Sequence, residues 1–311
     1  MKILICGSLA FDTIMVFPDR FSRHILPDQV RMLSVSFTIG EMRREWGGCA
    51  GNIAYNLQAL GAETAVLATL GHDGEDYRAR LAAQGIDIAG VRTLADAYTA
   101  QAFIITDLDD NQITAFHPGA MARSHEIPVS TVKSPRLAII APDGRDGMMT
   151  HAADLAAAGV PYIFDPGQAM TLFSGDELLQ VIDSAAVVAV NDYEARLLEE
   201  LTGMPLVSIA TRLDALIVTR GAEGSEMFVE GRTLAIPVAH AAAVVDPTGC
   251  GDAYRAGILY GMANGWDWER SGKLAATLGA LKIGTRGGQN HAVGRDQVAA
   301  LYYESFKQYP W

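Results

Sequence analysis

Cysteine is scarce in this sequence, and no pattern uses it. Three cysteines occur among 311 residues, namely Cys6, Cys49 and Cys250. Their number is odd and no two of them form a C-x-x-C pair, so the sequence argues against both a disulfide scaffold and a zinc site. The seven histidines contain no H-E-x-x-H or similar ligand pair, which removes the commonest helical zinc motif.

Long hydrophobic runs and an excess of positive charge are also absent. No apolar run approaches the length of a transmembrane helix, and the opening segment 1–7 resembles a strand too short for the core of a secretory signal. The formal net charge is −12 and the isoelectric point is about 5.0, so the protein would repel nucleic acid and anionic membranes. We therefore expect a cytoplasmic protein without a nucleic-acid or membrane partner.

What is present is the composition of a chain with a large hydrophobic core. Half of the residues are hydrophobic and 19% are charged, and the length allows one large α/β domain. Apolar runs of strand length alternate with segments that carry apolar residues at helical spacing. The predicted strands are 3–6, 137–141, 162–164, 185–190 and 215–219, and the predicted helices are 148–158, 177–183 and 193–201.

Continuous apolar strands separated by helices predict a mostly parallel sheet with helices on both faces, a three-layer α/β/α arrangement. Ligands of such sheets gather at the carboxyl ends of the strands. Polar residues or glycines directly follow four of the predicted strands, at 7–8, 165–167, Asn191 and 219–221. We expect these residues to lie along one rim.

Two segments, 12–46 and 98–118, break the alternation. The first contains short apolar pieces with little amphipathic helix, and the second alternates as strands do. Together they could form a small separate sheet, which we interpret as a lid, although two surface excursions would explain them equally well. The linkers are short, so we expect one domain over 1–311 with the lid as an insertion. An exposed lid sheet could also pair two subunits into a homodimer.

A small-residue loop, Asp246-Pro247-Thr248-Gly249-Cys250-Gly251-Asp252, leads into an apolar stretch typical of a buried helix. The first N–H groups of a helix have no hydrogen-bond acceptor within the helix, and the helix N-terminus is partly positive. Glycines let these N–H groups converge on an anion, because no Cβ is in the way. Asp252 suits a base that takes a proton from a hydroxyl while the loop stabilises a transferred phosphoryl group. For the isolated motif, an ordinary N-cap Asp is the favoured explanation. No histidine lies near Cys250 in the sequence, so we interpret it as a small loop residue.

A second glycine-rich segment, 47–61, also leads into an apolar helix. Close backbone approach to a ligand would explain Gly47 and Gly48, and the Asn52 amide could bind hydroxyls. A flexible hinge would explain the glycines too. Asp12 could accept two hydrogen bonds from the vicinal hydroxyls of a ribose or another sugar, but as a surface residue it would need no such role.

Asn191 and Glu194 form an Asn-x-x-Glu capping pattern, which structure alone explains. A functional version would aim Glu194 at the waters of a Mg²⁺ ion.

On the predicted lid, Phe103 and Phe116 could stack on a flat base, although a Phe on a strand is more often a core residue. Between a strand and a hairpin-like stretch at 225–235, four residues could line a nucleotide or simply form a turn: Thr219, Arg220, Gly221 and Gly224.

Together these motifs resemble the ribokinase-like (PfkB) family of carbohydrate and nucleoside kinases, nearly from end to end. The family's C-terminal signature, approximately D-T-x-G-A-G-D, matches 246–252, its glycine signature matches 47–52, and its N-x-x-E element matches 191–194. The strings 33–37, 111–116, 118–121 and 165–168 are most similar to those of bacterial adenosine or nucleoside kinases. The departures are Pro247 and Cys250 within the signature, and Ala102 where some adenosine kinases carry an aromatic residue.

The resemblance implies a ribokinase-like fold with ATP and Mg²⁺ as cofactors and a nucleoside as acceptor. Asp252 would take the proton of the 5′-hydroxyl of a purine nucleoside, which attacks the γ-phosphate of ATP and gives AMP from adenosine. The N–H groups of Gly249, Cys250 and Gly251 would stabilise the developing charge. The other implied contacts are Asp12, Gly48 and Asn52 for the ribose, Ser8, Ser36, Phe116 and Gln168 for the base, Asn191 and Glu194 for the Mg²⁺ region, Thr219, Arg220, Gly221 and Gly224 for ATP, and Asp246 and Thr248 for a monovalent cation such as K⁺.

Three other functions fit these motifs less well than a nucleoside kinase. A ribose or fructose kinase would share Asp252 and the glycines but would have no use for Phe116 and Gln168 against a base. A dinucleotide-dependent dehydrogenase is disfavoured because the first strand is followed by no G-x-G-x-x-G pattern. A non-catalytic sugar-binding protein is disfavoured by the placement of Asp252 and by the expected lack of a secretory signal.

Overall fold

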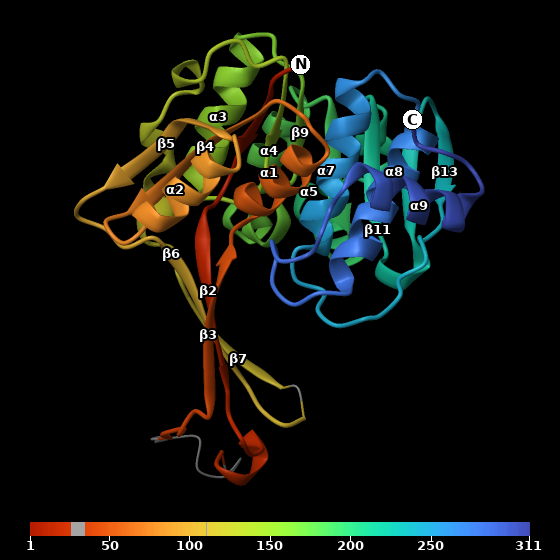
Figure 1. Cartoon of the computed structure of the whole chain (residues 1–311). Helices are drawn as coiled ribbons and strands as arrows, with labels where there is room; N and C mark the ends of the chain where they lie inside the picture. Colours follow the sequence, from red (N-terminus) through yellow and green to blue (C-terminus); the bar gives the residue numbers. More distant parts are fainter. Residues whose placement is uncertain (26–34, 110) are drawn as a thin grey trace.

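The main body of the protein is built on a nine-stranded sheet (Figure 1). The computed structural model describes residues 1–25, 35–109 and 111–311. The strands are β1 (Ile3–Cys6), β4 (Thr64–Gly71), β5 (Asp87–Leu94), β8 (Leu137–Ile140), β9 (Tyr162–Phe164), β10 (Val187–Asn191), β11 (Ala215–Thr219), β12 (Ser225–Val229) and β13 (Arg232–Ile236). Their order is β13-β12-β11-β10-β9-β8-β1-β4-β5. In this order, all neighbouring strands from β11 through β5 pair in parallel. β12 pairs antiparallel with β11 and with β13 at the edge of the sheet.

Helices cover both faces of this sheet. Successive side chains of a strand point to opposite faces, and here both sets are apolar and buried, so each face packs against helices. Ile3 and Ile5 of β1 face one layer, and Leu4 and Cys6 face the other. The first layer holds α1 (Cys49–Ala59), α2 (Glu75–Ala83), α7 (Cys250–Ala263), α8 (Trp268–Ile283) and α9 (Arg295–Phe306), and the second holds α3 (Arg145–Ala157), α4 (Gly175–Ile182), α5 (Asp192–Thr202) and α6 (Leu206–Ala210). The short 3₁₀ helices are η1 (Phe21–Arg23), η3 (Gly119–Glu126), η4 (Val129–Thr131), η5 (Gly167–Leu172) and η6 (Gly221–Glu223). The predicted three-layer α/β/α arrangement is confirmed. Across the described ranges, every helix is too short or too polar to cross a lipid bilayer.

A smaller sheet projects from this body (Figure 1). Its strands are β2 (Ala10–Val16), β3 (Glu41–Gly47), β6 (Ala100–Thr106) and β7 (Gln112–His117), in the order β3-β2-β6-β7. Only the β2–β6 pair is parallel. The strands come from the two segments assigned to a lid, 12–46 and 98–118, so a separate sheet exists, whereas its action as a lid stays a prediction. Residues 26–34 and 110 of these segments lie outside the described residues.

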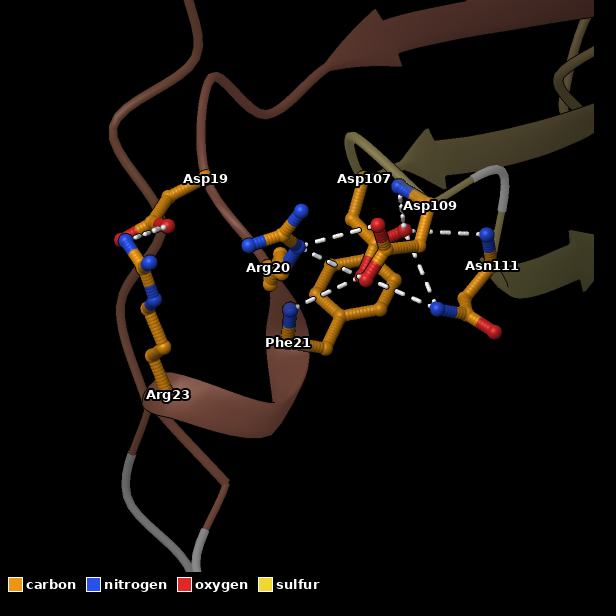
Figure 2. A network of polar contacts seen from close by, with 7 residues as sticks. All are labelled: Asp19, Arg20, Phe21, Arg23, Asp107, Asp109 and Asn111. Atoms are coloured by element: carbon orange, nitrogen blue, oxygen red, sulfur yellow. Dashed lines mark hydrogen bonds and ion pairs between the residues drawn. The ribbon is translucent and has the colours of Figure 1, made fainter.

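The far end of the small sheet is held by a polar network around Asp107 (Figure 2). The Asp107 carboxylate follows β6 and accepts hydrogen bonds from the backbone N–H groups of Phe21, Asp109 and Asn111, each at 2.9 Å. Arg20 Nε also donates to the Asp109 carboxylate at 2.9 Å. The segment after β2 is thereby joined to the turn between β6 and β7.

The predicted elements are present with small shifts at their ends. β1, β9 and β11 occupy the predicted residues, whereas β8 ends at Ile140 and β10 begins at Val187. β4, α2 and β5 are absent from the predicted set, although all eight residues of β4 are buried. Thr69 interrupts the apolar run of β4, and Thr64 and Gly71 form its ends, so its unbroken apolar run is only residues 65–68.

Candidate active site

Asp252 lies in the first turn of α7, where the loop 246–251 meets the helix. The N-cap residue Gly249 has φ +80°, a left-handed conformation that glycine adopts without strain. Cys250 N donates to Pro247 O at 3.1 Å and closes the loop as a turn. Of the three N–H donors expected from the sequence, that of Cys250 is therefore already used. Those of Gly249 and Gly251 have no acceptor among the described residues and are open to an anion.

The partly buried Asp252 carboxylate is oriented by Asn52. Asn52 Nδ2 donates to Asp252 Oδ2 at 2.8 Å. Loss of hydration raises the pKa of Asp252 to about 6, and the hydrogen bond from Asn52 opposes this shift. Such a carboxylate is ionised at neutral pH yet is a stronger base than a surface Asp, which suits it to accept a proton from an alcohol.

A chain of hydrogen bonds fixes the Asn52 side chain, which is 4% exposed on α1. Its Oδ1 accepts from Gln289 Nε2 at 3.2 Å, and the same nitrogen donates to Tyr77 Oη at 2.6 Å. Tyr77 Oη in turn donates to Gly47 O at 2.7 Å. Asn52 therefore positions Asp252, while the second N–H of its Nδ2 has no acceptor among the described residues. Its role as a ribose contact stays a prediction.

Asp12 lies on β2, close enough to Asp252 for the two charges to interact. Loss of hydration raises the pKa of Asp12 to about 6, and the charge of Asp252 adds to the shift. A Cβ on Gly47 would come within 2.4 Å of Asp12 Oδ2, and a Cβ on Gly48, whose φ is +86°, would lie 2.5 Å from Ser8 O. The two glycines are therefore required for close packing around the Asp12 strand.

The strand register places Asp12 and Phe116 on one face of the small sheet. Asp12 pairs with Ala102 of β6, and Ala102 pairs with Phe116 of β7, and paired residues point to the same side of a sheet. Phe103, the next residue on β6, points to the opposite face. Phe116 is 49% exposed, so its ring is free to contact a ligand beside the Asp12 carboxylate.

Two residues expected near the base, Ser8 and Gln168, follow strands of the large sheet. Ser8 Oγ accepts from Cys49 N at 3.1 Å, so the hydroxyl caps the start of α1. Gln168 is exposed in η5, at the rim where β9 ends. The roles of both residues as contacts of the base stay predictions.

Ser36, the third such residue, lies at the far end of the small sheet. Its neighbour Phe37 packs with ring centroids 4.7 Å from Phe17 and 5.2 Å from Phe21. Phe17 follows Asp12 by five positions, which along an extended strand is about 17 Å. Ser36 is therefore not brought together with Asp12 in this structure.

A cavity of about 550 Å³ opens beside the anion loop, a size typical of small-molecule sites. Its walls contain Cys250 and Gly251 of the loop together with Thr219, Gly221 and Gly224. Apolar side chains form much of the remaining surface, including Val238, Ala239, Val244, Tyr254, Ala276 and Ile283.

Arg220 differs from its neighbours in the predicted ATP region. Its Nη2 donates to Glu226 Oε2 at 2.7 Å, and it is not among the residues that line the cavity. Its backbone N–H donates to Gly224 O at 2.8 Å. Arg220 therefore stabilises the turn between β11 and β12.

Asn191 and Glu194 form the capping box of α5. Asn191 Oδ1 accepts from Glu194 N, and Asn191 N donates to Glu194 Oε2, both at 2.8 Å. Burial raises the pKa of Glu194, and its Oε1 is not used by the cap. No group of three or more His, Cys, Asp and Glu side chains suited to a metal occurs in the described ranges. A Mg²⁺ ion held here would depend on water and phosphate oxygens, which Mg²⁺ accepts readily.

Asp246 joins the anion loop to the segment after α8. Its Oδ1 accepts from Thr248 N and its Oδ2 from Gly287 N, each at 2.9 Å. Its backbone carbonyl accepts from Lys282 Nζ at 2.8 Å. All three oxygens of this residue therefore have a donor within the chain.

Several groups around the Asp252 carboxylate were not expected from the sequence. Arg255, one turn beyond Asp252, forms a buried pair with Asp165 at 3.0 and 3.3 Å. A charge inside the apolar stretch of α7 was a signal for such a partner, because a buried charge requires one. Nothing local pointed to Gln289, which contacts Asn52 across 237 positions of sequence.

Comparison with known proteins identifies the family. The model of the pfkB family of carbohydrate kinases matches residues 9–293. The chain belongs to the pfkB family. As a member of the pfkB family it is a phosphotransferase, and the glycine and aspartate signatures on which the resemblance depended both lie within the matched range.

Several of the proteins that this chain is similar to are nucleoside kinases. The nucleoside kinase of Methanocaldococcus jannaschii is 30% identical over 267 residues, which cover 85% of this chain and 88% of that one. The structure of the Burkholderia thailandensis nucleoside kinase in complex with inosine is 48% identical with a TM-score of 0.90 and 99% coverage of both chains. The complex of the same protein with ADP-inosine is 50% identical with a TM-score of 0.88, covering 99% of this chain and 97% of that one. Thermotoga maritima ribokinase, at 19% identity, a TM-score of 0.81 and coverage of 97% and 99%, shares the fold. The predicted ribokinase-like fold is confirmed.

Proposed function

We propose that this pfkB-family kinase transfers the γ-phosphoryl group of ATP to the 5′-hydroxyl of a purine nucleoside, with adenosine as the expected acceptor, AMP as the product and purine salvage as its role. The observation that carries the proposal is the position of Asp252, which adjoins the cavity through Gly251 and interacts with Asp12 of the small sheet. The inosine complex of a relative 48% identical supports a purine nucleoside as acceptor.

In the proposed reaction Asp252 is the general base. It takes the proton of the 5′-hydroxyl, the oxygen bonds to the γ-phosphorus, and the bond to the bridging oxygen breaks to leave ADP. The N–H groups of Gly249 and Gly251, at the positive end of α7, donate to the phosphoryl oxygens as their charge grows. The hydrogen bond from Asn52 keeps the carboxylate aimed at the hydroxyl.

The acceptor would lie along the row of Asp12, Ala102 and Phe116. At neutral pH the Asp12 carboxylate, with a pKa of about 6, is ionised and can accept hydrogen bonds from both ribose hydroxyls. The Phe116 ring would stack on the base, a contact that every base can make through its flat face. Base preference would then depend on polar contacts at the edge of the base, for which Ser8, Ser36 and Gln168 stay proposals.

The donor nucleotide would lie in the cavity of about 550 Å³. Its apolar walls suit an adenine ring, and Thr219, Gly221 and Gly224 would border the nucleotide. A Mg²⁺ ion, when bound, neutralises charge on the transferred phosphates. Glu194 Oε1 would hold it through water, and Asn191 orients Glu194 through the capping box.

A panel of acceptors tests this function. Adenosine, inosine and ribose are assayed side by side with MgATP, and we expect phosphorylation of the nucleosides with adenosine preferred. Activity on ribose alone would contradict the proposal and establish a sugar kinase. Tight nucleoside binding without ATP turnover would instead indicate a binding protein.

We also propose that the small sheet pairs two subunits. Met42, Phe103 and Ile113 are 72%, 40% and 40% exposed, and the register places all three on the face opposite Asp12. An apolar face of this kind on a projecting sheet is typical of an interface. Sedimentation equilibrium should give the mass of a dimer, and a monomer at all concentrations would exclude this arrangement.

A further inference from the structure

Lys282 is a fully buried lysine that contacts the anion loop. It lies in the last turn of α8 and is 0% exposed. Its Nζ donates to the carbonyl oxygens of Asp246 at 2.8 Å and of Thr285 at 2.9 Å. A buried ammonium group is costly to desolvate unless oxygen atoms surround it, so these two contacts are required for Lys282 to remain in this position.

Ordinary helix capping explains only one of the two contacts. A lysine near a helix C-terminus often bonds the carbonyl groups at the end of its own helix, and Thr285 O fits that role. Asp246 O belongs instead to the first residue of the loop 246–251, 36 positions away in the sequence. Val245 N and Asp246 N also donate to Ile283 O, at 2.8 and 3.1 Å. Lys282 therefore holds the start of the anion loop against the end of α8.

The family resemblance implies a monovalent cation at Asp246 and Thr248, and the residues present do not fit one. A K⁺ ion is held by several carbonyl oxygens that replace its hydration shell. Here Asp246 O already accepts from the ammonium group, and both carboxylate oxygens accept from the N–H groups of Thr248 and Gly287. The ammonium group of Lys282 already supplies the positive charge that a K⁺ ion would bring.

We propose that Lys282 is an internal cation that positions the anion loop, so that phosphoryl transfer by this protein requires no monovalent cation. The inference rests on the proposed kinase function. Lys282 is a positioning residue, because it acts through the loop and contacts the backbone of Asp246.

The charge of Lys282 acts on neighbouring groups of the loop. Burial raises the pKa of Cys250 to about 11, and the ammonium group opposes this rise. Burial would also raise the pKa of Asp246, but the N–H groups of Gly287 and Thr248, together with the ammonium group, hold it below its ordinary value. The contact of Lys282 Nζ with Asp246 O places the ammonium group next to the turn that would receive the phosphoryl group.

The wild-type protein gives the first test. Turnover of MgATP and a nucleoside is compared in KCl, NaCl and choline chloride at matched ionic strength. We expect equal turnover in the three salts. Stimulation by KCl over choline chloride would overturn the inference and leave the kinase function intact.

Two replacements of the lysine test its role directly. K282A removes the ammonium group and leaves room for an ion, so turnover in choline chloride should fall on the order of 10²-fold, as for a misplaced catalytic group. KCl or NH₄Cl should restore most of it. K282M fills the space with a neutral chain and should lose as much activity without rescue. The control is K273A, because Lys273 lies on the same helix but donates to Glu269 and Gln308. Equal loss in K282A and K282M in every salt would reduce Lys282 to a structural contact.

Thermal unfolding provides a readout that does not depend on activity. KCl should raise the Tm of K282A relative to choline chloride and leave the Tm of the wild type and of K273A unchanged. If the acceptor panel shows no kinase activity, this comparison still tests Lys282. Equal stabilisation of wild type and K282A by KCl would contradict the inference. If K282A does not fold in any salt, the comparison of wild-type turnover in KCl, NaCl and choline chloride decides whether the inference holds.

Discussion

Two opposing influences meet at the Asp252 carboxylate. Loss of hydration makes the charged form less favourable and raises its pKa to about 6, while the hydrogen bond from Asn52 Nδ2 favours that charged form. The result is a group that is ionised at neutral pH and more basic than an exposed Asp. The same balance predicts how the enzyme responds to substitution and to pH.

The first prediction concerns D252N. An amide cannot accept the hydroxyl proton, so kcat should fall on the order of 10²–10⁴-fold, the usual contribution of a general base. The nucleoside KM should stay within a few-fold, because Asp12 and Phe116 are unchanged. Steady-state kinetics with adenosine and MgATP measure both constants. A kcat close to the wild-type value would mean that Asp252 has only a structural role in the first turn of α7.

The second prediction is the acid limb of the pH–rate profile. A base must be deprotonated to act, so kcat/KM should fall as pH decreases through the pKa of about 6. Asp12 also has a pKa of about 6, so the limb reports the coupled pair. Circular dichroism at each pH checks that the fold persists. A midpoint near the ordinary Asp value of about 4 would contradict the raised pKa.

At the scale of single elements, the register of the small sheet decides which aromatic residues can reach the acceptor. Phe116 lies across β6 from Asp12, whereas Phe103 lies on the reverse face. The two residues are of one type, on neighbouring strands and similarly exposed. They therefore form a matched pair for testing the base contact.

The third prediction compares F116A with F103A. Base stacking on an aromatic ring contributes about 1–3 kcal/mol, so F116A should raise the nucleoside KM roughly tenfold or more. F103A should leave it near the wild-type value. Sedimentation of both variants checks that any change in KM does not come from altered subunit pairing. Equal effects of the two substitutions would remove Phe116 from the acceptor site.

Elements were predictable where the signal is local. β9 and β11 are short apolar runs ended by Asp165 and by Arg220-Gly221, so their bounds follow from the sequence, whereas Thr69 interrupts the apolar run of β4. The anion loop was predictable for the same reason, because seven consecutive residues, 246–252, contain it. The side-chain contacts between distant segments were not predictable from the sequence. Nothing in the spacing of α8 shows that Lys282 is buried, since its contact at Asp246 belongs to another segment.

At the scale of the whole molecule, the site depends on packing between distant parts of the chain. Asn52 on α1 and Asp252 on α7 are 200 positions apart, yet they share a hydrogen bond. The sheet supports this contact, since both helices lie on the same face of it. Such contacts arise only when the tertiary structure forms, which is why the sequence did not indicate that Asn52 orients the Asp252 carboxylate.

The rim of the sheet also carries a carboxyl group that the proposed reaction does not use. Asp143 follows β8 and is 3% exposed. Its Oδ1 accepts from Gly144 N at 2.8 Å, whereas its Oδ2 has no hydrogen-bond partner among the described residues. Burial raises the pKa of Asp143 to about 7, against the opposing effect of the Gly144 N–H. Ionisation of this group should therefore destabilise the whole fold.

The last prediction is that D143N stabilises the protein in a pH-dependent way. A carboxyl group with a raised pKa contributes stability below its unfolded pKa of 3.8, and this contribution is lost as pH rises through about 7. The amide keeps an acceptor for Gly144 and stays neutral, so the free energy of unfolding of D143N should exceed that of the wild type by on the order of 2 kcal/mol or more at pH 8. The advantage should shrink steadily toward pH 4, as measured by urea unfolding. D214N, at an exposed carboxyl, is the control. A difference that is constant with pH would show that Asp143 does not titrate within the fold.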